Sequence, residues 1–172
     1  MWERVIKIVR LIFAVIEKVS EWLSMVMLVA MIAIISYQIV MRYVFNNSPS
    51  WSEEVAILLI VWFGILSIPI GVKYHLHIGI EFLFNLFPQP IQRIGFQIIF
   101  LLIAGFGMVM VISGTELVQF MMMSTLPATK LPSAVEYAVI PISGLMVVYN
   151  ALENVFMPFE QLQNNIKQAR GI

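Results

Sequence analysis

Residues 23–41, LSMVMLVAMIAIISYQIVM, form a run that contains no charged side chain. A helix needs about 20 mostly apolar residues to cross the hydrocarbon core of a bilayer, and this run meets that length. Similar runs follow at residues 55–72, 94–115 and 137–152. Only helices and closed barrels satisfy their backbone groups in lipid, and these runs lack the alternation of barrel strands. The sequence therefore predicts an all-α integral membrane protein with four transmembrane helices.

The composition supports a membrane protein. Of the 172 residues 60% are hydrophobic and 12% charged, and the mean hydropathy is +0.92. Ordinary soluble domains are about 45–50% apolar and about 25% charged. This composition excludes a soluble enzyme and a nucleic-acid binder, and the absence of cysteine excludes thiol chemistry. We expect no catalytic residues, no cofactor and no metal.

We expect a single membrane domain over residues 1–172, with amphipathic helices beside the spans. Residues 1–21 carry apolar side chains at helical spacing between charges, which predicts an interfacial helix and an uncleaved anchor. This helix either bends into the first span or runs continuously into it. The predicted segments are spans at about 22–43, 53–73, 92–115 and 134–157, an interfacial helix at 78–87 and a polar tail at 158–172.

The basic residues predict the orientation. With four spans, one side of the membrane holds eight of them: Arg4, Lys7, Arg10, Lys18, Lys73, Arg93, Lys167 and Arg170. The other side holds Arg42 and Lys130. Under the positive-inside rule, this difference places both termini in the cytoplasm.

Charged residues flank the connection between the first two spans. Arg42, Glu53 and Glu54 allow an ion or proton site, but charges at the end of a span can reach water, so we favour a structural role. In that interpretation Ser50 and Glu53 form a capping box and Arg42 pairs with Glu54. Ser133 and Glu136 have the same spacing before the last span.

Other polar or small residues suggest packing rather than chemistry. His75 and His77 are two apart and therefore point to opposite sides of a helix, which disfavours a shared metal or haem. Small residues that allow close helix approach recur on spans two and three: Gly64, Gly71, Ala104, Gly107 and Gly114. Pro69 and Pro141 should bend their spans. No span carries a charge at its centre, which favours a partner subunit over an independent carrier.

Several motifs in order resemble one family. They are Arg42-Tyr43, Trp51-x-Glu53-Glu54, Val61-Trp62 followed by Gly64, His77-Ile78-x-Ile80-Glu81, Leu131-Pro132 and Ile140-Pro141. The chain resembles the small membrane subunit of tripartite ATP-independent periplasmic (TRAP) transporters, the DctQ-like family, and within it the small subunit of sialic-acid transporters. Glu81 departs from the family, which often has Asp there.

The resemblance implies a bacterial inner-membrane protein that forms a heterodimer with a large elevator subunit. The large subunit carries the substrate and sodium sites, and a periplasmic binding protein delivers an organic anion, here sialic acid. The small subunit is then a static scaffold in contact with membrane lipids and not with nucleic acid. Its interface candidates are Arg42, Trp51, Glu53, Glu54, Trp62, Gly64, His77 and Glu81. Candidates for docking the binding protein are Asn46, Asn47, Ser48, Thr129 and Lys130.

Two other functions stay open from the residues. One is a haem-anchoring or electron-transfer membrane subunit, which a Soret band would reveal. The other is a small independent channel, which activity of the chain alone in liposomes would reveal.

Overall fold

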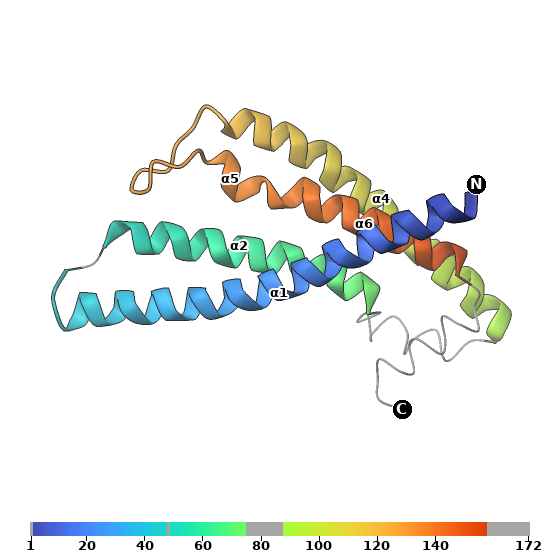
Figure 1. Ribbon diagram of the computed structural model, residues 1–172, viewed down its shortest axis with the longest axis horizontal. Coiled ribbons are helices and arrows are strands. Elements are labelled where there is room, and N and C mark those ends of the chain that lie inside the picture. The colour runs from blue at the N-terminus through green and yellow to red at the C-terminus, as the bar shows by residue number, and fades with distance from the viewer. Residues whose placement is uncertain (1, 48, 75–87, 158–172) are drawn as a thin grey trace. The chain divides into compact units, whose positions relative to one another are not determined.

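The computed structural model describes residues 2–47, 49–74 and 88–157. These residues form five helices: α1 (Trp2–Tyr43), α2 (Ser50–Lys73), α4 (Gln89–Met121), α5 (Ala134–Tyr137) and α6 (Val139–Phe156) (Figure 1). Four stretches are long and apolar enough to cross a membrane: Lys7–Tyr43, Ser50–Lys73, Ile91–Met121 and Ala134–Phe156. The predicted all-α class with four candidate spans is confirmed. The expected interfacial helix at 78–87 and the tail at 158–172 lie outside the described residues.

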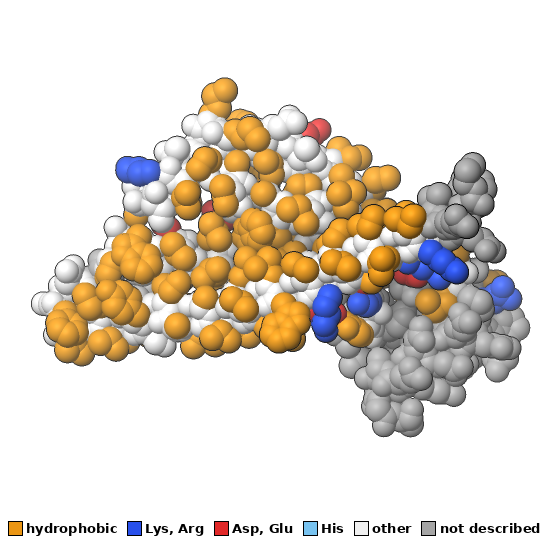
Figure 2. Space-filling view, viewed as in Figure 1, with side chains coloured by type: hydrophobic (Ala, Val, Ile, Leu, Met, Phe, Trp, Pro, Cys, Tyr) orange, Lys and Arg blue, Asp and Glu red, His pale blue; other side chains and the backbone are white. Residues whose placement is uncertain are grey.

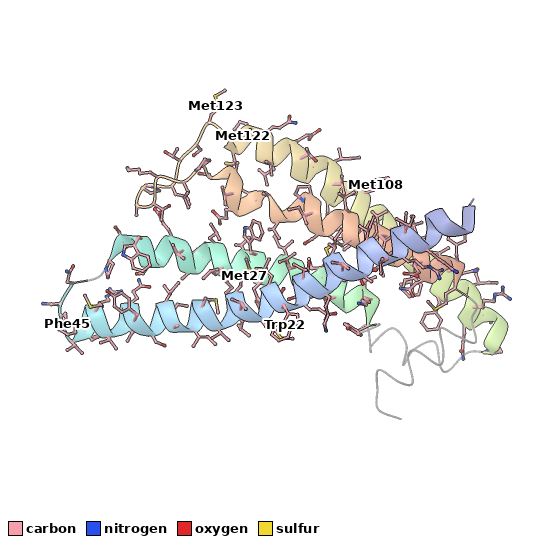
Figure 3. All side chains as sticks on the ribbon, viewed as in Figure 1. Trp22, Met27, Phe45, Met108, Met122 and Met123 are labelled. Atoms are coloured by element: carbon pink, nitrogen blue, oxygen red, sulfur yellow. The ribbon has the colours of Figure 1, made fainter. Side chains whose placement is uncertain are left out.

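Helix α1 is unbroken from Trp2 to Tyr43, a run of 42 residues. At 1.5 Å per residue its axis is about 63 Å long, roughly twice the thickness of the hydrocarbon core. Of the two alternatives for the N-terminal segment, the structure shows the continuous one. Trp22, where the other alternative would place a bend, lies in the middle of the helix with its side chain exposed (Figure 3).

The chain divides into two compact units, each made of two separate segments of the sequence. Helices α2, α4 and α6 each contribute residues to both units. Unit 1 comprises Met1–Ser67 and Gly114–Ile140, and unit 2 comprises Ile68–Ser113 and Pro141–Ile172. Unit 1 contains α1 antiparallel to most of α2, the end of α4, the following loop and α5 (Figure 1). Unit 2 contains the last turns of α2 and most of α4 and α6.

Within unit 2, α4 and α6 approach each other at two glycines. A Cβ placed on Gly107 would lie 2.9 Å from Val147 Cγ1 and 3.1 Å from the carbonyl oxygen of Gly144. A Cβ on Gly144 would lie 2.9 Å from the carbonyl oxygen of Gly107. The two backbones therefore meet where both side chains are hydrogen, as expected for helices that associate by packing in lipid. Val147, Met146 and Ala151 are buried beside this contact.

The break between α5 and α6 is explained by the missing backbone N–H of Pro141. Pro141 has no backbone N–H, so it cannot donate the helical hydrogen bond to Tyr137, four residues before it. Tyr137 is the last residue of α5, and α6 begins at Val139. The sequence predicted a bend at Pro141; the structure shows an interruption of the helix at Ala138, close to the start of this span.

Apolar side chains cover the outside of the helices. Only 6% of the most apolar window of α1 is buried, and the values for α2 and α4 are 22% and 28%. Figure 2 shows hydrophobic side chains over most of the visible helical surface. A protein in water rarely exposes contiguous apolar area on this scale, whereas a bilayer favours it.

Candidate functional site

The carboxylate of Glu54 binds a loop that follows it by more than seventy residues. Its Oε1 accepts a hydrogen bond from the backbone N–H of Ala128 at 2.6 Å. Its Oε2 accepts one from the backbone N–H of Thr129 at 2.8 Å and one from Thr129 Oγ1 at 2.9 Å. Glu54 lies in the second turn of α2, so one rigid helix holds the tip of the loop between α4 and α5.

The loop also has backbone hydrogen bonds of its own, besides those to Glu54. The N–H of Leu126 donates to the carbonyl of Leu131 at 2.8 Å, and Lys130 N–H donates to Leu126 at 3.0 Å. Lys130 has a φ of 61°, in the left-handed region that closes such a turn. The Ser133 N–H donates to the Ser124 carbonyl at 2.8 Å and narrows the base of the loop. The loop is therefore a short, hydrogen-bonded hairpin.

The expected pairing of Arg42 with Glu54 is wrong. Both Glu54 oxygens face the loop, and Arg42 is exposed and makes no ion pair in the part of the chain that the structure describes. A carboxylate that accepts backbone N–H groups makes strong, charge-assisted hydrogen bonds without a counter-ion. Glu53, one residue earlier, is exposed.

The two predicted capping boxes are also wrong. Ser50 is the first residue of α2 rather than its cap, and it is Ser52 Oγ that donates, at 2.7 Å, to the Pro49 carbonyl. Ser133 precedes α5 but makes no side-chain capping bond; its hydroxyl donates instead to Ser124 Oγ at 3.3 Å. Ser133 thus bonds a residue of the preceding loop rather than the helix that it precedes.

Both tryptophans among the candidates contribute to unit 1. The indole Nε1 of Trp62 donates to the carbonyl of Val135 in α5 at 3.0 Å. The ring of Trp51 stacks on Tyr37 of α1, with centroids 6.3 Å apart and an interplanar angle of 30°. The start of α2 is thus tied to α1 by a ring contact and to the second loop by Glu54.

The candidate Gly64 differs from Gly107 and Gly144, the two glycines at which α4 and α6 meet. A Cβ on Gly64 or on Gly71 would have no atom within 4 Å among the described residues, whereas Gly107 has close contacts. Gly144, which the sequence analysis missed, completes the contact with Gly107; its signal was a glycine inside an apolar span. The structure therefore assigns Gly107 to helix packing and leaves Gly64 on an open surface.

The docking candidates lie on the two connections of unit 1. Asn46, with a φ of 53°, and Asn47 are exposed on the α1–α2 connection, and Lys130 is exposed at the tip of the hairpin. Thr129 is half-buried because Glu54 holds it. Phe45, Met122 and Met123 are exposed on the same two connections (Figure 3). Ser48, His77 and Glu81 lie outside the described residues.

Sequence analysis also missed a set of buried polar side chains. Glu17, Ser20, Glu21 and Ser24 of α1 are all at least nine-tenths buried, and Lys18 Nζ pairs with Glu21 at 3.1 Å. Their spacing of three and four residues along the helix was the available signal. In unit 2, Asn150 is buried and its Nδ2 donates to the carbonyl of Pro69 at 3.2 Å.

The geometry offers positioning rather than catalysis. Within residues 2–47, 49–74 and 88–157, no three His, Asp or Glu side chains are grouped so that they could hold a metal ion. The contacts of Glu54, Trp62 and Trp51 instead fix helices and loops to one another. Such an arrangement suits a frame that presents two shaped connections at one end.

Comparisons with known proteins found matches over most of the chain. Residues 31–161 match the family model described as the DctQ component of tripartite ATP-independent periplasmic transporters. The chain is similar to the sialic acid TRAP transporter small permease protein SiaQ of Vibrio cholerae, 25% identical over 145 residues, 83% of this chain and 82% of the relative.

Two longer proteins match as well. The sialic acid TRAP transporter permease protein SiaT of Haemophilus influenzae is 41% identical over 78 residues, 45% of this chain and 13% of the relative. The isethionate TRAP transporter permease protein DctMQ of Oleidesulfovibrio alaskensis is 27% identical over 130 residues, 70% of this chain and 20% of the relative. The chain thus spans a small part of these two relatives.

Proposed function

This chain belongs to the DctQ component family of TRAP transporters, and on that premise we propose that it is the static scaffold for a large elevator subunit. The family makes it a small permease component of a transporter and not an enzyme. Its four apolar helices indicate a multi-pass protein of the inner membrane. The proposal concerns how this subunit contributes to uptake.

The observation that carries the scaffold role is the binding of the second loop by Glu54. A transport domain that moves through the bilayer needs a partner that does not deform with it. The three hydrogen bonds that Glu54 accepts from residues 128 and 129, together with the bond that Trp62 donates to Val135, fix α2, α5 and the hairpin to one another. The close contact of Gly107 with Gly144 stiffens unit 2 in the same way.

The proposed substrate is sialic acid, taken up with sodium. Two relatives, SiaT and SiaQ, are named as sialic acid transporter permeases, whereas DctMQ is named for isethionate. All three names support uptake of an organic anion. One of the two sialic acid proteins, SiaQ, matches 83% of this chain. Sodium drive follows from the family resemblance, in which the large subunit carries the sodium sites.

We place the docking of the periplasmic binding protein on the two connections of unit 1. Asn46, Asn47 and Lys130 are exposed there, and the hairpin that carries Lys130 is already ordered by Glu54. A pre-formed loop binds with a smaller loss of conformational entropy than a loop that must fold on contact. Orientation with both termini in the cytoplasm puts these connections in the periplasm.

Reconstitution tests the scaffold and substrate together. Proteoliposomes that contain this chain, the large subunit and the binding protein should accumulate labelled sialic acid when a sodium gradient is applied. Omission of this chain should abolish uptake, and omission of sodium should do the same. Uptake by the large subunit without this chain, or by this chain alone, would contradict the scaffold role.

A charge reversal tests docking. Lys130→Glu should raise the concentration of binding protein needed for half-maximal uptake about tenfold, while the maximal rate stays the same, because rim charges act mainly on association. Lys7→Glu is the matched control. It reverses the charge of a lysine that lies on the cytoplasmic side in the proposed orientation, so it should have no effect. Equal responses to the two reversals would exclude a local contact at Lys130.

Orientation has a simple test because the chain has no cysteine. A single cysteine introduced as Asn46→Cys should react with a membrane-impermeant maleimide added to intact spheroplasts. Lys7→Cys should react only after the membrane is opened. The reverse pattern would contradict cytoplasmic termini.

A further inference from the structure

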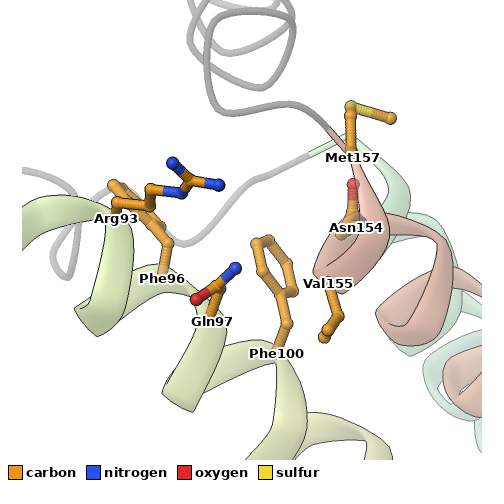
Figure 4. Close-up of a pocket in the computed structure, with 7 residues that line it drawn as sticks. All are labelled: Arg93, Phe96, Gln97, Phe100, Asn154, Val155 and Met157. Atoms are coloured by element: carbon orange, nitrogen blue, oxygen red, sulfur yellow. The ribbon is translucent and has the colours of Figure 1, made fainter.

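A shallow pocket opens between the ends of α4 and α6 in unit 2 (Figure 4). The empty space in and above it amounts to about 240 Å³, which includes open solvent. Phe96 and Phe100 of α4 form an apolar wall with Val155 of α6, and Arg93, Gln97 and Asn154 supply the polar groups. The pocket therefore combines an aromatic wall with a cation and two amides.

Asn154 is the residue that marks this pocket as a site. Its exposed fraction is 7%, so it is more than nine-tenths buried, and it lines the pocket. Its side-chain amide lines the pocket, where a bound polar group can reach it.

Arg93 lies on the other side of the pocket and has no counter-ion among residues 2–47, 49–74 and 88–157. It is exposed and makes no ion pair or hydrogen bond within the described residues. It stands near the N-terminus of α4, whose first turn carries no acidic residue. The helix dipole is positive at that end, so Arg93 and the dipole both favour an anion.

The surroundings indicate the source of that anion. The candidate spans begin at Ile91 and end at Phe156, so the pocket lies where α4 and α6 leave the apolar layer, at the depth of lipid headgroups. Beyond Arg93 the surface of α4 is apolar and exposed, at Ile94, Ile98 and Leu101. A free phosphate gains nothing from such a surface, whereas acyl chains do.

We propose that this pocket binds the headgroup of an anionic phospholipid, with its phosphate between Arg93 and Asn154 and its acyl chains along the exposed face of α4. Basic pockets between transmembrane helices recognise anionic headgroups through the same chemistry. The guanidinium of Arg93 donates to the phosphate oxygens, and the amide N–H₂ of Asn154 donates from the other helix. The lipid thereby links the ends of α4 and α6.

Native mass spectrometry of the full chain, delipidated in mild detergent, tests this site. Titration with phosphatidylglycerol should give a bound species at lower concentration than titration with phosphatidylethanolamine, about five- to tenfold, because only the former is anionic. Arg93→Gln should remove this preference, and Arg93→Lys should retain most of it. Asn154→Asp, which is isosteric but adds a negative charge, should weaken phosphatidylglycerol binding at least as much as Arg93→Gln.

Arg42→Gln is the matched control, because Arg42 is also exposed and without an ion pair. It removes the same charge at the end of α1 and should leave lipid binding unchanged. Helical content by circular dichroism shows that each variant is folded. Equal binding of the two lipids to the unaltered chain, or undiminished preference in Arg93→Gln, would overturn the site. Displacement of the lipid by millimolar inorganic phosphate would show a free-anion site and overturn the assignment to lipid.

Discussion

Glu54 and Thr129 are joined by two hydrogen bonds, from the backbone N–H at 2.8 Å and from the hydroxyl at 2.9 Å, although 75 residues separate them. This contact fixes the hairpin after α4 to the start of α2. A separate ring contact, between Trp51 and Tyr37, joins the start of α2 to α1.

Removal of the negative charge of Glu54 should loosen the hairpin. Glu54→Gln keeps the size of the side chain but weakens its bonds to the N–H groups of Ala128 and Thr129, because hydrogen bonds to a charged acceptor are about twice as strong. The amides of these two residues should then exchange with deuterium roughly tenfold faster or more. Hydrogen exchange measured by mass spectrometry reports this change.

Glu53→Gln is the control for that experiment. It removes the same charge one residue earlier from an exposed side chain, so exchange in the hairpin should not change. In the assembled transporter we expect Glu54→Gln to reduce uptake but not abolish it, because its role is structural. Complete loss of uptake in a fully assembled complex would contradict that role.

The indole of Trp62 should contribute through its N–H. Trp62→Phe leaves an aromatic ring but removes the donor to Val135, and we expect a loss of about 0.5–1.5 kcal/mol in the free energy of unfolding. Trp51→Phe keeps the stacking on Tyr37 and should cost less. Unfolding by titration with sodium dodecyl sulfate, followed by circular dichroism, compares the two. A larger cost for Trp51→Phe would show that ring contact outweighs the hydrogen bond.

Two glycines on α4 should respond in opposite ways to the same substitution. Gly107→Ala forces a methyl group against Val147, Val148 and the Gly144 carbonyl, and it should destabilise the chain by about 1–3 kcal/mol. Gly105→Ala meets no atom within 4 Å and should be neutral or slightly stabilising, because alanine favours a helix. The same denaturation assay applies, and equal effects would disprove the close contact of α4 with α6.

Asn150 should stabilise unit 2 by its bond to the carbonyl of Pro69. Asn150→Ala removes the donor, and interhelical hydrogen bonds in membranes typically contribute about 0.6 and at most about 1.7 kcal/mol. Asn150→Asp should be worse than Asn150→Ala, since it turns a buried carboxyl group toward a carbonyl oxygen. Thermal stability in detergent gives the order of the three proteins. An Asn150→Asp variant as stable as the unaltered chain would contradict this hydrogen bond.

The sequence by itself determined the class of the protein and the places of the four apolar helices that are long enough to cross a bilayer. An apolar run such as residues 55–72 is necessary and nearly sufficient to predict a span. The hydrocarbon core contains no water, so the backbone N–H and C=O groups of such a run must bond one another in a helix. Pro141 predicted a local distortion of its helix, since proline lacks the N–H that a helix needs. Even the small-residue stripe that contains Gly107 was visible as a helix contact.

Only the tertiary structure decided which faces and which polar groups meet. In water, the apolar face of a helix marks its core side, but a bilayer makes every face apolar, so hydropathy does not distinguish Gly107, which packs, from Gly64, which stays open. The partners of Glu54 and Asn150 lie 74 to 81 residues away along the chain. Local spacing favoured Arg42 and the capping boxes, whereas the actual acceptors and donors come together only after the hairpin and the helices have packed.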